Sequence, residues 1–227
     1  MALSITHIHQ EHTVTPGNSL CKYADDTYVI ILAANAHSRV SEIDNVEAWA
    51  HHNNLHLNRQ KCVEVLFTSS RTRHAVQPPP PLPDIARVSS LKILGVTVSS
   101  RLSVANHVQN VISSCARTLH ALRMLRAHGL CDVALQTVYR AVVVARLLYA
   151  ASARFTTAAD RQRIEGFLCR GVRAGYRRAD EPTAAGRAGR RLGWSAVPQC
   201  PVQQLSRSAS TASRPSHWLT CLAHSQT

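Results

Sequence analysis

The amino-acid sequence predicts an α+β fold, with strands and one helix in the first hundred residues and helices after them. Short runs rich in β-branched residues, such as "TYVIIL" at residues 27–32, are typical of buried strands. From residue 108 onward, apolar residues recur every three or four positions, which is typical of amphipathic helices. Beyond Glu181 the chain shows neither the apolar runs of strands nor the apolar repeat of helices, and it has no acidic residue. Its composition there is rich in Ser, Ala, Arg and Pro, which predicts disorder.

Two short strands are expected to form a β-hairpin near the start of the chain. They span residues 20–23 and 27–32 and flank the bend "ADD" at residues 24–26. An irregular, histidine-rich lead-in over residues 1–19 precedes them. The second strand is almost wholly apolar, so both of its faces are expected to be buried.

A helix and further strands follow the hairpin. The helix is expected over residues 38–54, because apolar residues recur on one face of that segment. Strands are expected over residues 63–68 and 91–98, the latter with a bend at Gly95. The proline run at 78–83 between them is interpreted as a stiff extended connector, with a ligand for a proline-binding partner domain as the alternative.

Three amphipathic helices are expected in the second half of the chain, and they predict a helical bundle. The third, over residues 159–175, is weaker and carries several arginines. The apolar faces expected to form the bundle core are Val108, Val111, Ile112, Cys115, Leu119, Leu122 and Leu125 on the first helix, and Leu135, Val138, Val142, Ala145 and Tyr149 on the second.

The composition is strongly basic, with a formal net charge of +13 and a pI of about 10.2. Such an excess favours polyanionic partners, of which nucleic acid and an anionic membrane are the candidates; a basic surface without a partner is the alternative. Three of the 26 basic residues are lysine and the rest are arginine, which suits bidentate contacts with phosphate.

Cysteine usage and hydropathy indicate where the protein works. The seven cysteines form no Cys-x-x-Cys pair and follow no signal peptide, which favours a reduced, intracellular protein, nuclear or cytoplasmic. No apolar run is expected to span a bilayer, because the best one, residues 141–151, is short and interrupted by Arg146. The sequence therefore predicts no membrane partner, and it leaves the oligomeric state open.

The adjacent carboxylates at the hairpin bend need a specific reason, because neighbouring like charges repel. A divalent cation supplies one. Mg²⁺ prefers hard oxygen ligands and usually keeps substrate phosphates in its coordination shell. Two such ions held by carboxylates stabilise the attacking and leaving oxygens in phosphoryl transfer. A basic protein with such a site points to nucleotidyl transfer.

Several motifs in order resemble the C-terminal half of a non-LTR retrotransposon (LINE-type) reverse transcriptase. "KYADDTYVI" resembles the metal-binding hairpin of the palm, and "IDNVEAWAHHNNLHLNRQKCVEVLF" resembles the following helix and N-x-x-K segment. "LKILGVTVSSRLSVANHV" resembles the strand pair that leads into the thumb, and the helices over 108–149 resemble the thumb. The resemblance covers about residues 14–182. It implies a partial palm over 20–100, a helical thumb over 101–178 and a tail over 179–227.

The resemblance also implies roles for individual residues at the hairpin. Asp25 would ligate the catalytic Mg²⁺, with Asp26 beside it as the second acidic residue of the metal site. Tyr23 and Ala24 would line the floor where the primer end and the incoming nucleotide meet. The substrates and partners would be an RNA template, a DNA primer and deoxynucleoside triphosphates.

Further roles fall on the N-x-x-K segment and on the first long helix. Asn58 would contact the nucleotide or primer, and Lys61 would lie near the nucleotide phosphates as a proton donor to pyrophosphate. The alternative for Lys61 is a solvated charge between helix and strand. The arginines of the first thumb helix would face the nucleic-acid backbone, or else form the polar side of an amphipathic helix; they are Arg117, Arg123 and Arg126.

The chain departs from the family pattern upstream of the hairpin. Nothing before residue 20 resembles the other metal-ligating aspartate, the nucleotide-selecting segment or the fingers, and Cys62 stands where a small hydroxyl residue is common. The isolated chain is therefore expected to be inactive, with an exposed edge on the palm sheet. Two alternatives stand beside a polymerase fragment: a standalone basic nucleic-acid-binding module, and a functionless remnant of an element.

Overall fold

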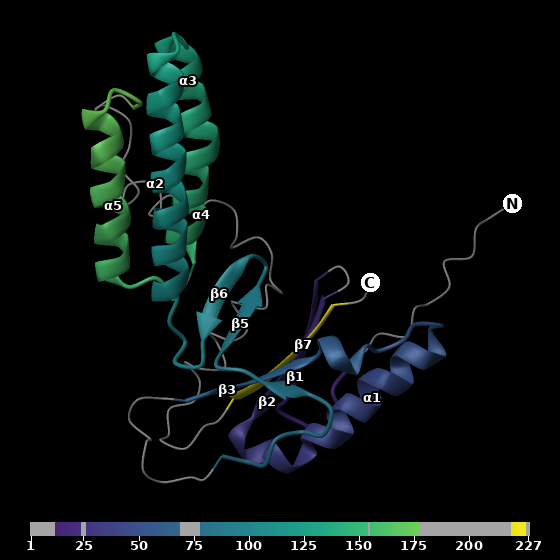
Figure 1. Cartoon of the computed structure of the whole chain (residues 1–227). Helices are drawn as coiled ribbons and strands as arrows, with labels where there is room; N and C mark the ends of the chain where they lie inside the picture. Colours follow the sequence, from purple (N-terminus) through teal and green to yellow (C-terminus); the bar gives the residue numbers. More distant parts are fainter. Residues whose placement is uncertain (1–11, 24–25, 69–77, 154, 178–218, 226–227) are drawn as a thin grey trace, which may run out of the picture. The chain divides into compact units, whose positions relative to one another are not determined.

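The computed structural model describes residues 12–23, 26–68, 78–153, 155–177 and 219–225. The chain forms two compact units (Figure 1). The sheet unit comprises the described residues up to Leu91, residues 99–101 and the strand at 219–225; the helical unit comprises residues 92–98 and the described residues from 102 to 177. Most strands lie in the first unit and most helices in the second, so the α+β fold class is confirmed.

A five-stranded sheet forms the centre of the sheet unit. Its outer strand β1 pairs antiparallel with β2, the inserted strand β7 pairs antiparallel with both β2 and β3, and the short β4 pairs parallel with β3. The hairpin predicted at the start of the chain is thereby confirmed. In spatial order the strands are β1 (Ser19–Tyr23), β2 (Asp26–Leu32), β7 (Leu219–Ser225), β3 (Val63–Phe67) and β4 (Ala86–Arg87).

The position of β7 corrects one expectation from the sequence. Residues 219–225 form a strand within the tail predicted to be disordered; this strand pairs with β2, whose other side pairs with β1, and β1 and β4 are the outer strands of the sheet. A strand between β2 and β3 gives hydrogen-bond partners to backbone groups that would otherwise be unpaired. This gain depends on segments nearly two hundred residues apart, so local composition does not reveal it. The remainder of the tail, residues 179–218 and 226–227, lies outside the described residues.

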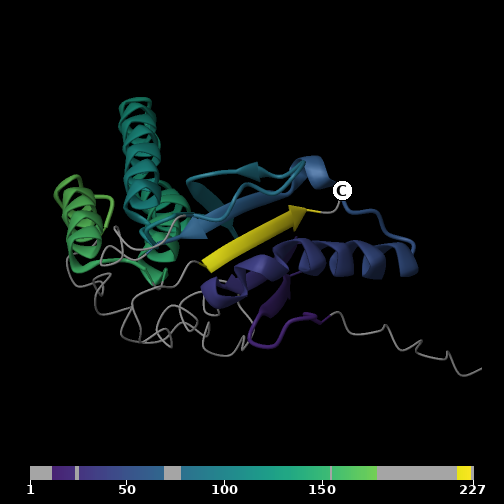
Figure 2. The ribbon, with the colours of Figure 1, turned by 90° about the horizontal axis from the view of Figure 1, so that it is seen from below.

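Helix α1 (Arg39–His52) covers one face of the sheet, as Figure 2 shows, and a short 3₁₀ turn, η1 (Ala33–Ser38), leads into it. The helix predicted over residues 38–54 is confirmed within its end residues. The core between helix and sheet is apolar, because α1 and β2 turn their apolar side chains toward each other. This core consists of Val29, Ile31, Ile43, Val46, Cys62, Leu82 and Ile85.

The strand predicted over 91–98 is a β-hairpin of β5 (Ser90–Ile93) and β6 (Val96–Ser99). Its turn places Leu94 at φ 47° and Gly95 at φ 81°, so the predicted bend is confirmed. Glycine adopts a positive φ without the steric cost that a Cβ brings. The hydroxyl of Tyr149 donates to the carbonyl of Leu94 and holds this turn against the helices of the same unit.

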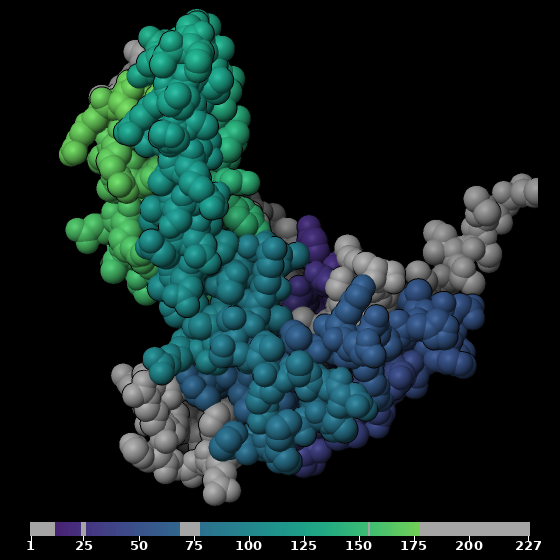
Figure 3. All heavy atoms as spheres, viewed as in Figure 1, coloured from purple at the N-terminus to yellow at the C-terminus, as the bar shows by residue number. Residues whose placement is uncertain are grey.

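The helical unit packs three helical rods against one another. In Figure 3, α5 (green) lies alongside α2 (teal). The middle rod runs without interruption from Asp132 to Ser152, and its central turns are π-helical. The elements are α2 (Ala105–Ala127), α3 (Asp132–Val138), η4 (Tyr139–Val144), α4 (Ala145–Ser152) and α5 (Ala158–Arg173).

The middle rod turns a different face to the core from the one the sequence predicted. Leu135 is buried as expected, but Val138, Val142 and Tyr149 are more than a third exposed, and Ala145 is exposed too. The rod is apolar on two sides, so helical periodicity fits either side equally well. Leu125 on α2 is likewise 45% exposed. The residues that are buried instead are Tyr139, Val143, Val144, Leu147 and Ala150.

The same rod is the one helix among the described residues that is long and apolar enough to cross a membrane. Length and composition alone give this result, and a core helix of a bundle passes the same test. The apolar run predicted at residues 141–151 is therefore only the second half of a longer helix, which begins at Asp132. With the rod packed against α2 and α5, its length is weak support for a membrane span.

Candidate functional site

The β1–β2 hairpin carries the residues that the sequence singled out for chemistry. Tyr23 pairs with Asp26, so Ala24 and Asp25 are the two residues between the paired strands. Ala24 and Asp25 lie outside the described residues. Asp26 was predicted to lie in the bend, but in the structure it is the first residue of β2 and is half-buried.

The described residues near the end of the β1–β2 hairpin differ in their contacts and in their exposure to solvent. The hydroxyl of Tyr28 donates to a carboxylate oxygen of Asp26 at 3.2 Å, which holds that carboxylate over β2. Tyr23, opposite it, is 51% exposed and presents its ring to solvent. The ammonium of Lys22 lies 4.0 Å from the ring centre of Trp49, a cation–π contact that ties β1 to α1.

The strand beside β2 bears on the chemistry of the hairpin. Ser225 of β7 is the residue opposite Asp26 across the β2–β7 pairing. No acidic residue follows Glu181, so β7 brings no carboxylate to this position. Among residues 12–23, 26–68, 78–153, 155–177 and 219–225, no group of three or more His, Cys, Asp or Glu side chains is arranged to hold a metal ion.

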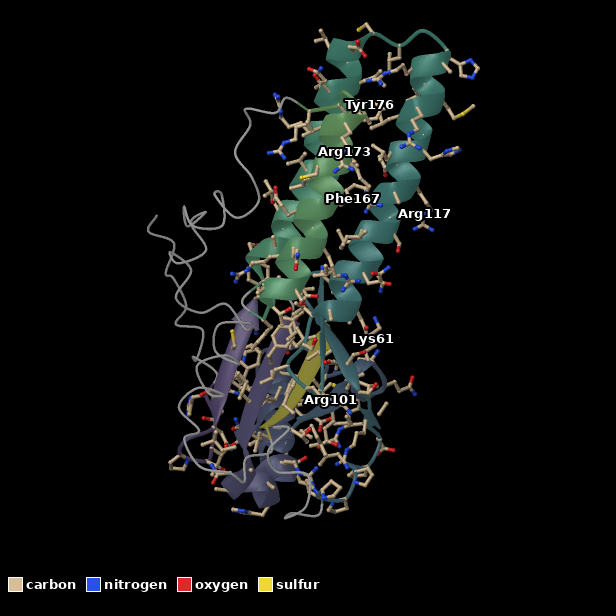
Figure 4. The ribbon with its side chains drawn as sticks, turned by 90° about the vertical axis from the view of Figure 1, so that its left-hand side faces the viewer. Lys61, Arg101, Arg117, Phe167, Arg173 and Tyr176 are labelled. Atoms are coloured by element: carbon tan, nitrogen blue, oxygen red, sulfur yellow. The ribbon has the colours of Figure 1, made fainter. Side chains whose placement is uncertain are left out.

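Asn58 and Lys61 lie at opposite ends of a short 3₁₀ turn, η2 (Arg59–Lys61). The side-chain oxygen of Asn58 accepts the backbone N–H of Lys61 at 3.3 Å and so caps this turn. The Lys61 side chain is exposed (Figure 4). This cap is a structural reason for asparagine at position 58 that requires no ligand.

Arg59 fastens the same turn to helix α1. Its guanidinium contacts Asp44 at 3.2 Å and also pairs with Glu47. The hydrogen bond that Arg59 donates to Glu47 is the main cause of a raised Arg59 pKa, so this arginine stays charged at any relevant pH. The turn that carries Lys61 is thereby held against α1.

Cys62 follows this turn directly and is buried in the core of the sheet unit. Burial raises the pKa of its thiol to about 11, because the charged thiolate would lose its hydration. Its Sγ lies 3.4 Å from the carbonyl of Asn58. Cys62 is therefore a neutral thiol at neutral pH, without the thiolate that nucleophilic cysteines require.

The sheet unit contains two buried carboxylates that the sequence did not predict. Glu64 is completely buried, and its oxygens bind Arg39 at 2.6 Å and Arg87 at 2.7 Å. The two arginines also donate to the carbonyls of Pro79 and Pro80, which docks the proline connector onto the sheet unit. One signal was available in the sequence: Glu64 is the lone charge in the apolar strand "VEVLF".

Glu42 is the second buried carboxylate, and it organises the lead-in before β1. Its two oxygens accept the backbone N–H groups of Val14 at 3.1 Å and Thr15 at 2.9 Å, and one also accepts the side-chain amide of Asn18 at 2.8 Å. Three donors satisfy a charge that would be costly to bury alone. Both buried carboxylates are saturated by protein donors, so neither is available to a metal ion.

The predicted nucleic-acid arginines differ in their surroundings. Arg117 and Arg123 are exposed on α2, and Arg117 extends away from the other helices (Figure 4). Arg126 is held within the bundle: it donates to the carbonyl of Ala174 at 2.8 Å, lies 3.2 Å from Asp132 and covers the ring of Tyr176. Arg126 therefore joins the ends of α2, α3 and α5, a role that its sequence context did not suggest.

The helical unit is basic throughout. Its described residues 102–177 include ten arginines and three acidic residues, and α2 has no acidic residue over its whole length. The acidic residues are Asp132, Asp160 and Glu165, and the arginines are Arg117, Arg123, Arg126, Arg140, Arg146, Arg161, Arg163, Arg170, Arg173 and Arg177.

Comparisons with known proteins give no relative for this chain. No protein-family model matches it, no curated protein matches it, and no solved structure matches it.

Proposed function

We propose that this chain is a piece of an RNA-directed DNA polymerase of the non-LTR retrotransposon type, inactive by itself. The observation that carries the proposal is the acidic doublet "DD" between two apolar strands that pair antiparallel. The strands on either side pair antiparallel with Tyr23 opposite Asp26, so Asp26, the second residue of the doublet, begins β2. A carboxylate pair at such a hairpin end is suited to holding Mg²⁺ against phosphate oxygens.

The order of elements along the chain supports the same proposal. A helix, a strand and a second hairpin follow the acidic hairpin, and an arginine-rich helical bundle follows them. In this proposal the bundle is the thumb, and Arg117 and Arg123 meet the backbone of the template–primer duplex. Lys61 approaches the nucleotide phosphates from its exposed position at the end of η2.

The expected inactivity has a physical reason. Two-metal nucleotidyl transfer requires carboxylates that converge from neighbouring strands. The strands next to β2 are β1 and β7, and neither has an acidic residue. Mg²⁺ dehydrates reluctantly and binds weakly where few carboxylates are offered.

A primer-extension assay with Mg²⁺ tests the inactivity of the isolated chain, with Asp25→Ala and Asp26→Ala as matched controls. We expect no template-dependent extension by any of the three proteins. Extension by the wild type that both variants lose would contradict the inactivity and support the metal-site assignment. The genomic sequence upstream tests the ancestry separately: an open frame encoding the missing aspartate and a fingers region is expected, and unrelated sequence there would remove the proposal.

A basic nucleic-acid-binding module is the second candidate, favoured by the absence of acidic residues on α2. Binding to an RNA–DNA hybrid with a recessed 3′ end separates the two candidates. A polymerase thumb is expected to prefer the recessed end over a blunt duplex, whereas a general module binds both alike. Both candidates require an affinity that falls steeply with salt and weakens in Arg117→Glu, since both rest on phosphate contacts. A salt-insensitive affinity would remove both.

A further inference from the structure

The exposed side of the rod from Asp132 to Ser152 presents an apolar stripe. It consists of Val138, Val142, Ala145 and Tyr149, spaced four, three and four residues apart. The three larger members are between 36% and 38% exposed. Residues spaced in this way lie near one side of the rod, so together they present an apolar surface to a second helix.

The stripe is additional to the core of the bundle. The opposite side of the rod packs against α2 and α5 through Tyr139, Val143 and Leu147, each of which is fully buried. The π-helical turns of η4 lie at the centre of this double-faced region. Turns of this type are rare and frequently occur at functional sites. A rod that is apolar on its exposed side as well as its buried side has a face that suits a partner.

The chemistry of the stripe indicates which partner. Its residues are small or β-branched apart from Tyr149, whose hydroxyl is fixed on Leu94. Small side chains such as Ala141 and Ala145 allow a second helix to approach closely, and both are exposed. Helices that insert into membrane surfaces instead rely on Trp, Phe and Leu. The stripe therefore suits a helix better than it suits a lipid surface.

Charge disfavours a second copy of this chain and favours an acidic partner. The rod has no acidic residue after Asp132, and its two charged residues beyond that point are Arg140 and Arg146, both exposed. Two copies of a chain with a net charge of +13 repel each other. Glutamates at the edges of an apolar seam on a partner helix would instead complement the arginines, as e and g positions do in coiled coils.

We propose that this stripe docks an acidic amphipathic helix of another protein. The apolar seam of the partner lies along Val138, Val142 and Ala145, and its flanking carboxylates meet the positive charge of the rod. The proposal is independent of polymerase activity, because no residue of the β1–β2 hairpin takes part in it, nor does Arg117 or Arg123.

The test is fluorescence anisotropy of a labelled synthetic helix with leucine at its a and d positions and glutamate at e and g, titrated with the full chain. The same peptide with lysine at e and g is the control for charge. The double variant Val138→Gln/Val142→Gln is expected to weaken binding of the acidic peptide about tenfold or more. The matched double variant Val40→Gln/Met124→Gln, which changes apolar residues exposed elsewhere, is expected to leave it unchanged.

A second pair of variants tests the charge contribution. Arg146→Glu is expected to weaken binding more than Arg161→Glu, which changes the net charge equally but lies on α5. Circular dichroism and thermal unfolding verify that each variant folds. Failure of the acidic peptide to bind, or equal losses in the stripe variant and its matched control, would overturn the proposal.

Two further measurements test whether the stripe instead binds a membrane surface or a second copy of the chain. Binding to vesicles of phosphatidylserine and phosphatidylcholine that is lost in Val138→Gln/Val142→Gln, without binding of the peptide, would assign the stripe to a membrane surface and overturn the proposal. Concentration-dependent dimers that the same variant dissociates would assign it to a second copy, with the same consequence. Monomeric protein that binds the acidic peptide and ignores the vesicles supports the proposal.

Discussion

The two units of this chain bury polar groups in different ways. The sheet unit encloses Glu42 and Glu64 and satisfies each from chain segments more than twenty residues away. The helical unit keeps most of its charges at the surface, and its buried Asp160 bonds to Thr157 three residues before it in a capping box. Stability in the sheet unit thus depends on long-range polar networks, whereas the helical unit depends on apolar packing and local caps.

Replacing Glu64 with Gln is expected to give the largest effect, confined to the sheet unit. It leaves the guanidinium groups of Arg39 and Arg87 without their common counter-charge, and removing one partner of a buried ion pair costs about 3–5 kcal/mol. Hydrogen exchange by mass spectrometry reports the two units separately. Glu47→Gln, which changes an exposed ion pair, is the control and is expected to cost less than about 1 kcal/mol. Equal effects of the two substitutions would contradict the buried network.

Proline in β7 is expected to have the next largest effect. Leu222 lies between Val29 and Glu64 in the sheet, and proline there removes a backbone donor from a central strand at a cost of about 3 kcal/mol. Leu222→Val keeps the donor and serves as the control. Faster exchange in β2 and β3 for the proline variant alone would sharpen the contrast between the units. Unchanged exchange would show that β7 does not complete the sheet.

Gly171→Ala tests the packing of the helical unit. A Cβ at this position would lie 1.9 Å from the hydroxyl oxygen of Tyr139, so the ring must move, at a cost of about 1–3 kcal/mol. Gly166→Ala on the same helix meets nothing within 4 Å and is expected to stabilise α5, by about 0.5–1 kcal/mol. Thermal unfolding measures both. Similar shifts in the two variants would contradict the close approach of Tyr139 to α5.

Acid sensitivity is the smallest expected effect and is specific to the helical unit. Burial, aided by the positive charge of Lys92, lowers the pKa of His107 in the folded chain. The unfolded chain therefore binds more protons between that lowered pKa and about 6.5, so stability falls as the pH drops through this window. Denaturant titrations at a series of pH values measure the slope. His107→Gln is expected to reduce it, and an unchanged slope in this variant would contradict the contribution of the buried imidazole.

Much of the secondary structure was predictable, because it depends on local pattern. The β1–β2 hairpin, α1, β3, the bend at Gly95 and the three helical rods all follow from apolar period and turn residues. For the candidate site, the sequence predicted the secondary-structure elements on which the residues lie. Asp26 and Lys61 lie where a hairpin and a connecting turn were expected, within one residue for Asp26.

Other features could not be predicted, because they depend on which distant groups meet. The anchoring of Arg126 and the burial of Glu64 are set by neighbours from other segments. The core face of the middle rod is a similar case. Val138 and Tyr139 are adjacent and both apolar, and packing against α2 and α5 decided that the tyrosine is buried.

The sequence by itself determined the strongly basic charge, the acidic doublet at a hairpin and the order of strands before helices, since these are properties of composition and short-range period. Tertiary structure alone decided that β7 completes the sheet, that Glu42 and Glu64 are buried and saturated, and that one of two apolar faces of the middle rod stays exposed. The physical reason is that backbone donors, buried charges and apolar faces can be satisfied by any suitable partner. Only the folded chain selects which partner each one meets.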